Sequence, residues 1–355
     1  MNLKVLIVDD TIVYRRIVAD VLAEIPGVEI AGSASNGKIA LARIKVMKPD
    51  LLTLDIEMPE MNGLEVLQAL KMENLDVGVI VLSSLTVKGG ELTMKALELG
   101  AFDFITKPDG TSQEENRRDI KRTLEPLIRA YAHRREISSI LRGTHVPGKG
   151  EPPQSAVRHL GPSIVSRMNS IALRAHAEIV GIGISTGGPN ALASLLPLLP
   201  GNIDVPVLIV QHMPPLFTKS LAASLDAKSA LTVKEGEDGE TIRNNVVYIA
   251  PGGRQMKVTL GANAVTKIIR VTDDPPENNC KPSVDYLFRS LAHHYVGRST
   301  GVIMTGMGND GTLGLRLMKR SGAAVIAQDE TTSVVFGMPK EAIEAGVVDV
   351  VAPLE

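Results

Sequence analysis

The chain has 355 residues, of which 44% are hydrophobic, and this length provides material for about two domains of ordinary size. The 38 basic and 40 acidic residues leave a formal charge of −2, and only 3% of the residues are aromatic. At the level of the whole chain this charge balance shows no electrostatic footprint of a nucleic-acid-binding protein, and the low aromatic content argues against platforms for base stacking. The single cysteine, Cys280, excludes an intramolecular disulfide and a CxxC metal cluster. We expect it to be a small buried hydrophobic residue in a reducing compartment.

The chain has no run of about 18 apolar residues that could form a membrane-spanning helix. An apolar segment at residues 3–8 is a plausible strand and begins too soon after Met1 for a signal peptide. We therefore expect a cytoplasmic protein without membrane insertion.

Short apolar runs alternate with segments of helical periodicity in the first third of the chain. Strands are expected at residues 3–8, 28–34, 51–54, 77–82 and 102–106. Five such units predict a parallel sheet in a first domain at residues 1–125. A charged helical segment interrupted by Pro126 follows, and residues 143–162 are rich in Gly, Pro and Ser, so residues 126–176 are predicted to be a helical and flexible linker.

A second alternating series begins near residue 177 and continues to residue 355. Strands are expected at residues 179–184, 205–210, 246–250, 301–305 and 323–327. The predicted fold class is therefore α/β, with two doubly wound parallel-sheet domains joined by a linker.

Polar and charged side chains follow the strands of the first domain at their carboxyl ends: Asp9 and Asp10, Asp55, Ser83 and Ser84, and Lys107. Because these ends meet at one crevice of a parallel sheet, we expect the side chains to lie together. Three carboxylates repel one another unless a hard cation such as Mg²⁺ lies among them. Each Asp alone could be a helix N-cap or a turn residue, but their shared placement favours a phosphoacceptor pocket.

The motifs Val8-Asp9-Asp10, Asp55-Ile56-Glu57-Met58-Pro59 with Asn62-Gly63, Ser83-Ser84 and Lys107-Pro108 resemble those of the response-regulator receiver family. The resemblance covers residues 1–124 and implies a flavodoxin-like fold with strand order 2-1-3-4-5. It also implies phosphorylation of Asp55 by a chemotaxis histidine kinase, Mg²⁺ held by Asp9, Asp10 and Asp55, and phosphoryl contacts from Ser83 and Lys107. Phe104 departs from the family, in which many members carry a switch Tyr at this position.

A candidate nucleophile follows the first strand of the second domain. Ser185 lies between Gly183 and Gly187 in a G-x-S-x-G pattern, in the strand–turn–helix context that a nucleophile elbow requires. The glycines could instead only permit close packing, and Ser185 could be a helix N-cap. A dinucleotide-binding fingerprint is a weaker alternative, because the spacing of Gly181, Gly183 and Gly187 is one residue too long and the next strand ends in Gln211 rather than an acid.

A nucleophilic Ser needs a base and an orienting carboxylate. His212 and Asp310 follow the strands at 205–210 and 301–305, whereas His293 and His294 fall in an expected amphipathic surface helix. His212 could be a turn residue and Asp310 a helix cap, but the placement of all three groups at strand ends predicts a Ser185-His212-Asp310 triad. Backbone N–H groups near Thr186 and in the segment 306–308 are the candidate oxyanion donors.

Six segments of the second domain resemble the chemotaxis receptor protein-glutamate methylesterases: Ser185-Thr186-Gly187-Gly188-Pro189, Gln211-His212-Met213-Pro214, Ile249-Ala250-Pro251-Gly252, Lys281-Pro282-Ser283-Val284-Asp285, Thr305–Gly311 and Ala327-Gln328-Asp329-Glu330. The resemblance implies hydrolysis of glutamate methyl esters on bacterial chemoreceptors with release of methanol, and often deamidation of glutamines. It assigns Ser185, His212 and Asp310 to the triad and places Thr186 and Met307 near the oxyanion. Gln255 stands where relatives often have His.

The two resemblances together imply a phosphorylation-activated response regulator of a two-component system. Its expected partners are methyl-accepting chemoreceptors as substrates and a chemotaxis histidine kinase as phosphodonor, with recruitment to chemoreceptor arrays. We expect Mg²⁺ as cofactor in the first domain, none for the ester chemistry, no nucleic-acid partner and a monomer. The alternative is a response regulator whose second domain only binds a partner or DNA, against which the charge balance argues.

Overall fold

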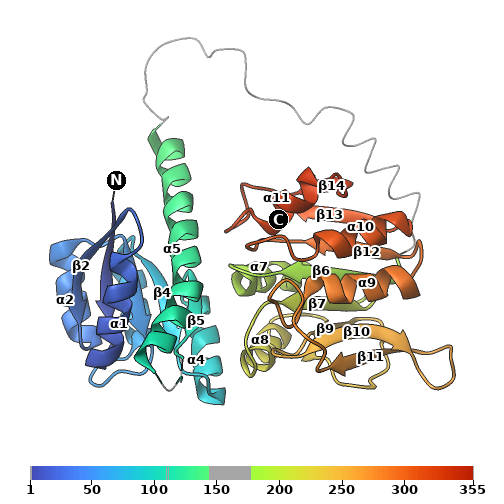
Figure 1. Ribbon diagram of the computed structural model, residues 1–355, viewed down its shortest axis with the longest axis horizontal. Helices are drawn as coiled ribbons and strands as arrows, with labels where there is room; N and C mark the ends of the chain where they lie inside the picture. The colour runs from blue at the N-terminus through green and yellow to red at the C-terminus, as the bar shows by residue number, and fades with distance from the viewer. Residues whose placement is uncertain (1, 109, 111, 144–176, 355) are drawn as a thin grey trace, which may run out of the picture. The chain divides into compact units, whose positions relative to one another are not determined.

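The computed structural model describes residues 2–108, 110, 112–143 and 177–354, and contacts divide the chain into two compact units at residues 1–136 and 137–355 (Figure 1). Each unit is described by itself. Within the predicted linker, residues 144–176 lie outside the described residues.

The first unit is built on a five-stranded parallel sheet with strand order β2-β1-β3-β4-β5. Its strands are β1 (Leu3–Val8), β2 (Val28–Ala34), β3 (Leu51–Asp55), β4 (Gly78–Ser83) and β5 (Asp103–Thr106). Its helices are α1 (Ile12–Ala23), α2 (Gly37–Met47), α3 (Gly63–Met72), α4 (Val87–Glu98) and α5 (Gln113–Gly143). Every residue of the central strand β3 is buried, as expected for a sheet covered on both faces. The predicted strands and their order are confirmed.

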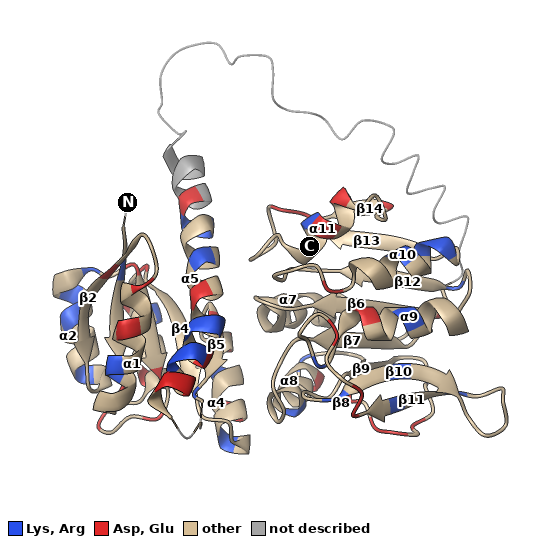
Figure 2. Cartoon of the chain, viewed as in Figure 1, with Lys and Arg blue, Asp and Glu red and all other residues tan. Residues whose placement is uncertain are grey.

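Helix α5 does not stop at the predicted interruption. It continues through Pro126, and Leu127 and Ile128 just beyond it are buried. Charged side chains of both signs follow one another along the helix (Figure 2), and several form ion pairs within it, such as Arg129 with Glu125. The first unit therefore extends to Glu136, past the predicted boundary at residue 125.

The second unit is built on a seven-stranded parallel sheet with order β14-β13-β12-β6-β7-β9-β8. Its strands are β6 (Ile179–Ile184), β7 (Val207–Gln211), β8 (Thr232–Glu235), β9 (Val246–Ile249), β12 (Ser299–Ile303), β13 (Ala324–Gln328) and β14 (Val350–Ala352). Five of these strands match the predicted ones within two residues. Strands β8 and β14 were not predicted, because they are edge strands of only four and three residues with partly exposed side chains.

An antiparallel hairpin of β10 (Gln255–Leu260) and β11 (Lys267–Thr272) was also not predicted. The helices of this unit are α7 (Gly188–Leu195), α8 (Phe217–Asp226), α9 (Val284–His294), α10 (Thr312–Arg320) and α11 (Met338–Glu344), with a 3₁₀ turn at Leu196–Leu198. Met256 and Val258 of the hairpin share one hydrophobic core with Phe288 and Leu291 of α9.

The expectation that the segment around His293 is a surface helix is therefore wrong for most of α9. The hairpin covers one face of this helix and the sheet covers another, so that Phe288 and Leu291 are fully buried and only its outer face, with His293, is exposed. Two glycines of β6 allow the close approach: a Cβ at Gly181 would lie 2.5 Å from Cδ1 of Leu291, and one at Gly183 would lie 2.3 Å from Cγ1 of Val284. These glycines thus face packed side chains rather than an open crevice for a dinucleotide.

None of the helices that the structure describes is both long and apolar enough to cross a bilayer.

Candidate active site

The three residues of the predicted triad follow the carboxyl ends of three adjacent strands of the second sheet, β12, β6 and β7. Ser185 directly follows β6 and His212 directly follows β7, and the N–H of His212 donates to the carbonyl oxygen of Ile184 at 3.1 Å, which continues the ladder between the two strands. The two residues therefore stand side by side on strands that are about 5 Å apart. Asp310 lies beyond β12, on the other side of β6, in the loop that leads to α10.

A tight turn follows β6 and holds Ser185 at the carboxyl end of this strand. Gly187 has φ +74°, a conformation that a Cβ would strain, and a Cβ there would also lie 2.5 Å from Cβ of Val334. The carbonyl oxygen of Ser185 accepts hydrogen bonds from the N–H of Gly188 and from Nε2 of Gln211. Gly187, not Ser185, is the N-cap of α7, so Ser185 does not have the structural role of a helix cap.

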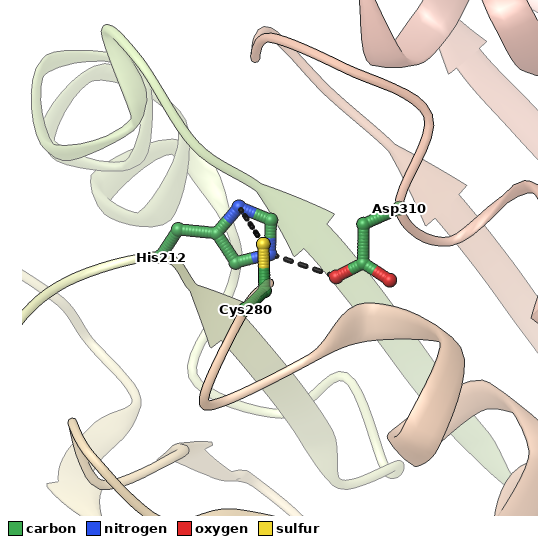
Figure 3. A group of neighbouring side chains, drawn as sticks. All are labelled: His212, Cys280 and Asp310. Atoms are coloured by element: carbon green, nitrogen blue, oxygen red, sulfur yellow. Dashed lines mark hydrogen bonds and ion pairs between the residues drawn. The ribbon is translucent and has the colours of Figure 1, made fainter. Parts of the chain in front are cut away.

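The imidazole of His212 is hydrogen-bonded directly to the candidate orienting carboxylate. Its Nε2 lies 2.8 Å from Oδ2 of Asp310, and its Nδ1 lies 3.8 Å from Sγ of Cys280 (Figure 3). Since Asp310 occupies Nε2, Nδ1 is the nitrogen left to accept a proton from Ser185. No hydrogen bond joins Ser185 to His212 among the described residues, a common situation for catalytic hydrogen bonds before substrate binds.

The Cys280 thiol contradicts the expectation of a buried hydrophobic residue. It is half-buried, lies 3.8 Å from Nδ1 of His212 and donates to the carbonyl oxygen of Asn278 at 3.4 Å. It reaches this position because the segment between β11 and α9 crosses the carboxyl ends of the strands, and no strand-end pattern in the sequence indicates this path.

The carboxylate of Asp310 is anchored at the N-terminus of α9 rather than capping α10. It accepts hydrogen bonds from the N–H groups of Val284 (2.7 Å) and Asp285 (3.1 Å) and from Oγ of Ser283 (2.9 Å). Helix N-termini favour anions because their first N–H groups lack partners within the helix and carry the positive end of the helix dipole. The N-cap of α10 is Gly311, so the predicted alternative of a helix-capping Asp310 is wrong for that helix.

The pKa values of this pair follow from burial and from these partners. Burial raises the pKa of Asp310, but the hydrogen bond and charge of His212 outweigh it, with further help from Asn278 and the Val284 N–H, and lower the pKa to about 2. Burial lowers the pKa of His212, but the hydrogen bonds to Asp310 and Cys280 outweigh it and raise the pKa to about 9. Asp310 thus stays ionised, and its charge increases the basicity of the His212 imidazole.

Two amide side chains, Asn278, which the sequence did not single out, and Gln255, hold Asp310 and its surroundings in place. Nδ2 of Asn278 donates to Oδ1 of Asp310 at 3.0 Å and to Oδ2 of Asp285 at 2.8 Å. The fully buried Gln255 accepts a hydrogen bond from the N–H of Ser283 and donates to the carbonyl oxygen of Pro275. Gln255 therefore fixes the loop that carries Asn278 and Cys280, a structural role that an amide can fill without an imidazole.

Two backbone N–H groups near Ser185 are available for an oxyanion. Within the part of the chain that the structure describes, the N–H groups of Thr186 and Met307 have no hydrogen-bond acceptor. Oγ1 of Thr305 donates to the carbonyl oxygen of Thr186 at 2.9 Å and ties the Ser185 turn to the loop that contains Met307. Gly306 lies against Ser185, and a Cβ at Gly306 would lie 2.7 Å from Cβ of Ser185.

The first sheet brings its predicted acidic residues together at the carboxyl ends of β1 and β3. The carboxylates of Asp9, Asp10 and Asp55 offer oxygen atoms within 4.8 Å of one another. Nζ of Lys107 lies 2.7 Å from Oδ2 of Asp9 and 2.8 Å from Oδ2 of Asp55. Burial raises the pKa of Asp55 to about 6, although the charge of Lys107 opposes this shift. Three carboxylates and one ammonium leave a charge of −2 when ionised, and this oxygen-rich set suits a hard divalent cation.

The predicted phosphoryl contact Ser83 is buried at the end of β4. Its Oγ donates to the carbonyl oxygen of Gly89 in α4 at 3.2 Å, whereas the neighbouring Ser84 is hydrogen-bonded to Glu57. The Ser83 hydroxyl is thus hydrogen-bonded to α4 and not directed to Asp55 by any hydrogen bond among the described residues.

Two family models match the chain, one for each unit. The model described as response regulator receiver domain matches residues 5–116, and the model described as CheB methylesterase matches residues 180–355. A protein-glutamate methylesterase/protein-glutamine glutaminase from Desulfotalea psychrophila is 53% identical over 353 residues, which cover 99% of this chain and 96% of that protein. The chain belongs to this family. A relative of the same name from Geobacillus kaustophilus is 44% identical over 100% of this chain and 96% of its own.

Solved structures match each unit separately. The CheB methylesterase catalytic domain of Thermotoga maritima is 46% identical and covers 50% of this chain and 93% of its own, with a TM-score of 0.49. The response regulator domain of Thermotoga maritima CheB is 37% identical and covers 37% of this chain and 98% of its own, with a TM-score of 0.34. The family membership confirms both resemblances that the sequence motifs indicated.

The hydrogen bond between His212 and Asp310 predicts a high titration midpoint for one imidazole. In NMR titrations of the ring signals, we expect His212 to titrate near pH 9, and in Asp310→Asn we expect its midpoint to move to lower pH because burial then acts with less opposition. Asp273→Asn, at an exposed carboxylate that pairs with Arg254, is the control and should leave the midpoint unchanged. An unchanged midpoint in Asp310→Asn would contradict the pairing.

Proposed function

We propose that Ser185, His212 and Asp310 are the catalytic triad that hydrolyses glutamate methyl esters on bacterial chemoreceptors. The direct hydrogen bond between Nε2 of His212 and Asp310, beside Ser185 on the neighbouring strand, is the observation that carries this proposal. The family name supports the substrate class, because the relatives are named protein-glutamate methylesterases and protein-glutamine glutaminases.

The proposed reaction has two steps. Nδ1 of His212 accepts the hydroxyl proton as Oγ of Ser185 attacks the ester carbonyl, and the resulting oxyanion accepts hydrogen bonds from the N–H groups of Thr186 and Met307. His212 returns the proton to the methoxy oxygen, methanol leaves and an acyl-enzyme remains. Water, deprotonated by the same nitrogen, then releases the glutamate side chain and regenerates Ser185.

The same acyl-enzyme accounts for deamidation of glutamine. When the substrate is a glutamine side chain, His212 protonates the departing nitrogen and ammonia leaves in place of methanol. The second step is unchanged, so one triad serves both reactions in the family name. The ester chemistry uses no cofactor in this proposal.

The receiver unit supplies the proposed regulation. Asp55 accepts a phosphoryl group from a chemotaxis histidine kinase; Asp9, Asp10 and Asp55 would hold a Mg²⁺, which would supply positive charge for the transfer. Lys107 is placed to pair with the phosphoryl oxygens. Oγ of Ser83 turns from the carbonyl oxygen of Gly89 to the phosphoryl group, so that α4 loses a contact and the phosphorylated unit activates the esterase.

The same proposal includes the location and the assembly of the protein. We expect a cytoplasmic monomer that is recruited to chemoreceptor arrays, where its receptor substrates and the kinase are concentrated.

Removal of the nucleophile tests the catalytic assignment. Ser185→Ala should lower methanol release from methylated receptor membranes about 10⁴-fold or more, because the nucleophile and base act as a unit. Ser194→Ala, which removes an exposed hydroxyl from the same helix α7, should retain full activity. Near-normal methanol release by Ser185→Ala would remove Ser185 from the mechanism.

Removal of the phosphoacceptor tests the regulation. Asp55→Asn should keep the basal rate of methanol release and lose its stimulation by an acyl phosphate with Mg²⁺. A tenfold stimulation corresponds to about 1.4 kcal/mol, which a new phosphoryl charge can supply. Asp20→Asn, at an exposed residue of α1, should remain stimulated. Stimulation that persists in Asp55→Asn would overturn the assignment.

A further inference from the structure

The thiol of Cys280 and Nδ1 of His212 lie together beside the proposed triad, and both are ligands that soft metal ions prefer. Sγ of Cys280 lies 3.8 Å from Nδ1 of His212, and a carboxylate oxygen of Asp310 lies within 4.8 Å of this thiol and of a ring nitrogen of His212 (Figure 3). Cys280 is half-buried, so a solvated ion can reach its thiol. The triad chemistry described above does not use this thiol.

We propose that Cys280 and His212 bind a thiophilic divalent cation such as Zn²⁺, and that this ion reversibly inhibits the esterase. Zn²⁺ lies about 2.3 Å from sulfur and about 2.0–2.1 Å from nitrogen in protein sites, so two tetrahedral ligands are separated by about 3.6 Å. The observed separation of 3.8 Å is close to this value, and a small rotation about the single side-chain torsion of Cys280 can adjust it.

The second nitrogen of the ring already has the partner that a metal-bound histidine requires. Histidine ligands usually donate their other ring N–H to a carboxylate, which fixes the tautomer and increases the basicity of the ligating nitrogen. Asp310 accepts this hydrogen bond from Nε2 at 2.8 Å, and α9 and Asn278 hold its carboxylate in place. The imidazole is thus preorganised with Nδ1 directed to an outside ligand.

Protons and charges balance in the proposed binding step. Zn²⁺ displaces the thiol proton of Cys280, and it displaces the Nδ1 proton when His212 is protonated, so that up to two protons pass to solvent. The thiolate neutralises one of the two positive charges of the ion, and the adjacent Asp310 carboxylate neutralises the other. Water molecules complete the coordination.

Inhibition of the esterase follows because the metal would occupy Nδ1 of His212, the nitrogen that acts as the base in the proposed triad. A metal on Nδ1 removes the lone pair that accepts the Ser185 proton, so methanol release stops while the ion is bound. This consequence rests on the proposed triad, whereas metal binding itself does not. With only two protein ligands, the site should release the ion to a chelator more readily than a four-ligand structural site does.

Metal binding is tested directly on the full chain. Because Cys280 is the only cysteine, a sulfur-to-metal charge-transfer band on addition of Co²⁺ would report this thiol alone. We expect the band, and one equivalent of Zn²⁺ that competes for it in equilibrium dialysis, in the parent chain and in His293→Ala, the control for the neighbouring His293–His294 pair. We expect the loss of both in Cys280→Ser. Equal Zn²⁺ binding by Cys280→Ser, or no band in the parent chain, would overturn the site.

Inhibition is tested in the same chains by methanol release. Zn²⁺ should inhibit the parent chain, a chelator should restore its activity, and the Zn²⁺ concentration for half inhibition should rise at least about tenfold in Cys280→Ser, relative to the metal-free rate of that variant. Zn²⁺ that occupies Cys280 without inhibiting would overturn the inhibitory role. Loss of activity in Ser185→Ala tests the triad separately, so the two failures can be distinguished.

Discussion

The position of the Asp310 carboxylate determines the chemistry of the second unit. Two N–H groups at the start of α9, the hydroxyl of Ser283 and Nδ2 of Asn278 donate hydrogen bonds to it and hold it in place, and its Oδ2 also lies 2.8 Å from Nε2 of His212. An ionised carboxylate without such partners would be costly to bury. The helix N-terminus supplies them from the backbone, so the charge is retained and the imidazole is fixed with Nδ1 3.8 Å from Sγ of Cys280.

The two sites of the chain use buried carboxylates in opposite ways. At Asp55, burial is the main cause of a pKa raised to about 6; it outweighs the ammonium of Lys107, and the charge of Asp9 adds to the shift. At Asp310, a histidine, an amide and helix N–H groups outweigh burial and lower the pKa to about 2. The first arrangement gives a carboxylate with a raised pKa beside other carboxylates, a set that suits a hard cation, and the second keeps an ionised carboxylate beside the His212 imidazole.

The sequence pattern predicted the five strands of the first sheet, five of the seven strands of the second and the groups at their carboxyl ends, because the carboxyl end of a parallel strand maps a sequence position onto a place in the fold. Ser185, His212 and Asp55 were found in this way. Asn278, Cys280 and Ser283 could not be found, because they lie in a loop after the β10–β11 hairpin, and neither the hairpin nor the path of the loop gives a periodic signal. A cap on the following helix α10 was the alternative role expected for Asp310. The helix that it contacts is instead α9, and this contact depends on tertiary packing, which a local sequence pattern does not show.

A serine-directed fluorophosphonate tests the central claim most directly, because its reaction requires Oγ of Ser185 and the base that activates it, without receptor or phosphodonor. Mass spectrometry should find one phosphonyl adduct on the peptide that contains Ser185. The labelling rate should fall about 100-fold or more in His212→Gln and remain unchanged in His294→Gln. An adduct on another residue, or equal labelling of His212→Gln and the parent chain, would contradict the account.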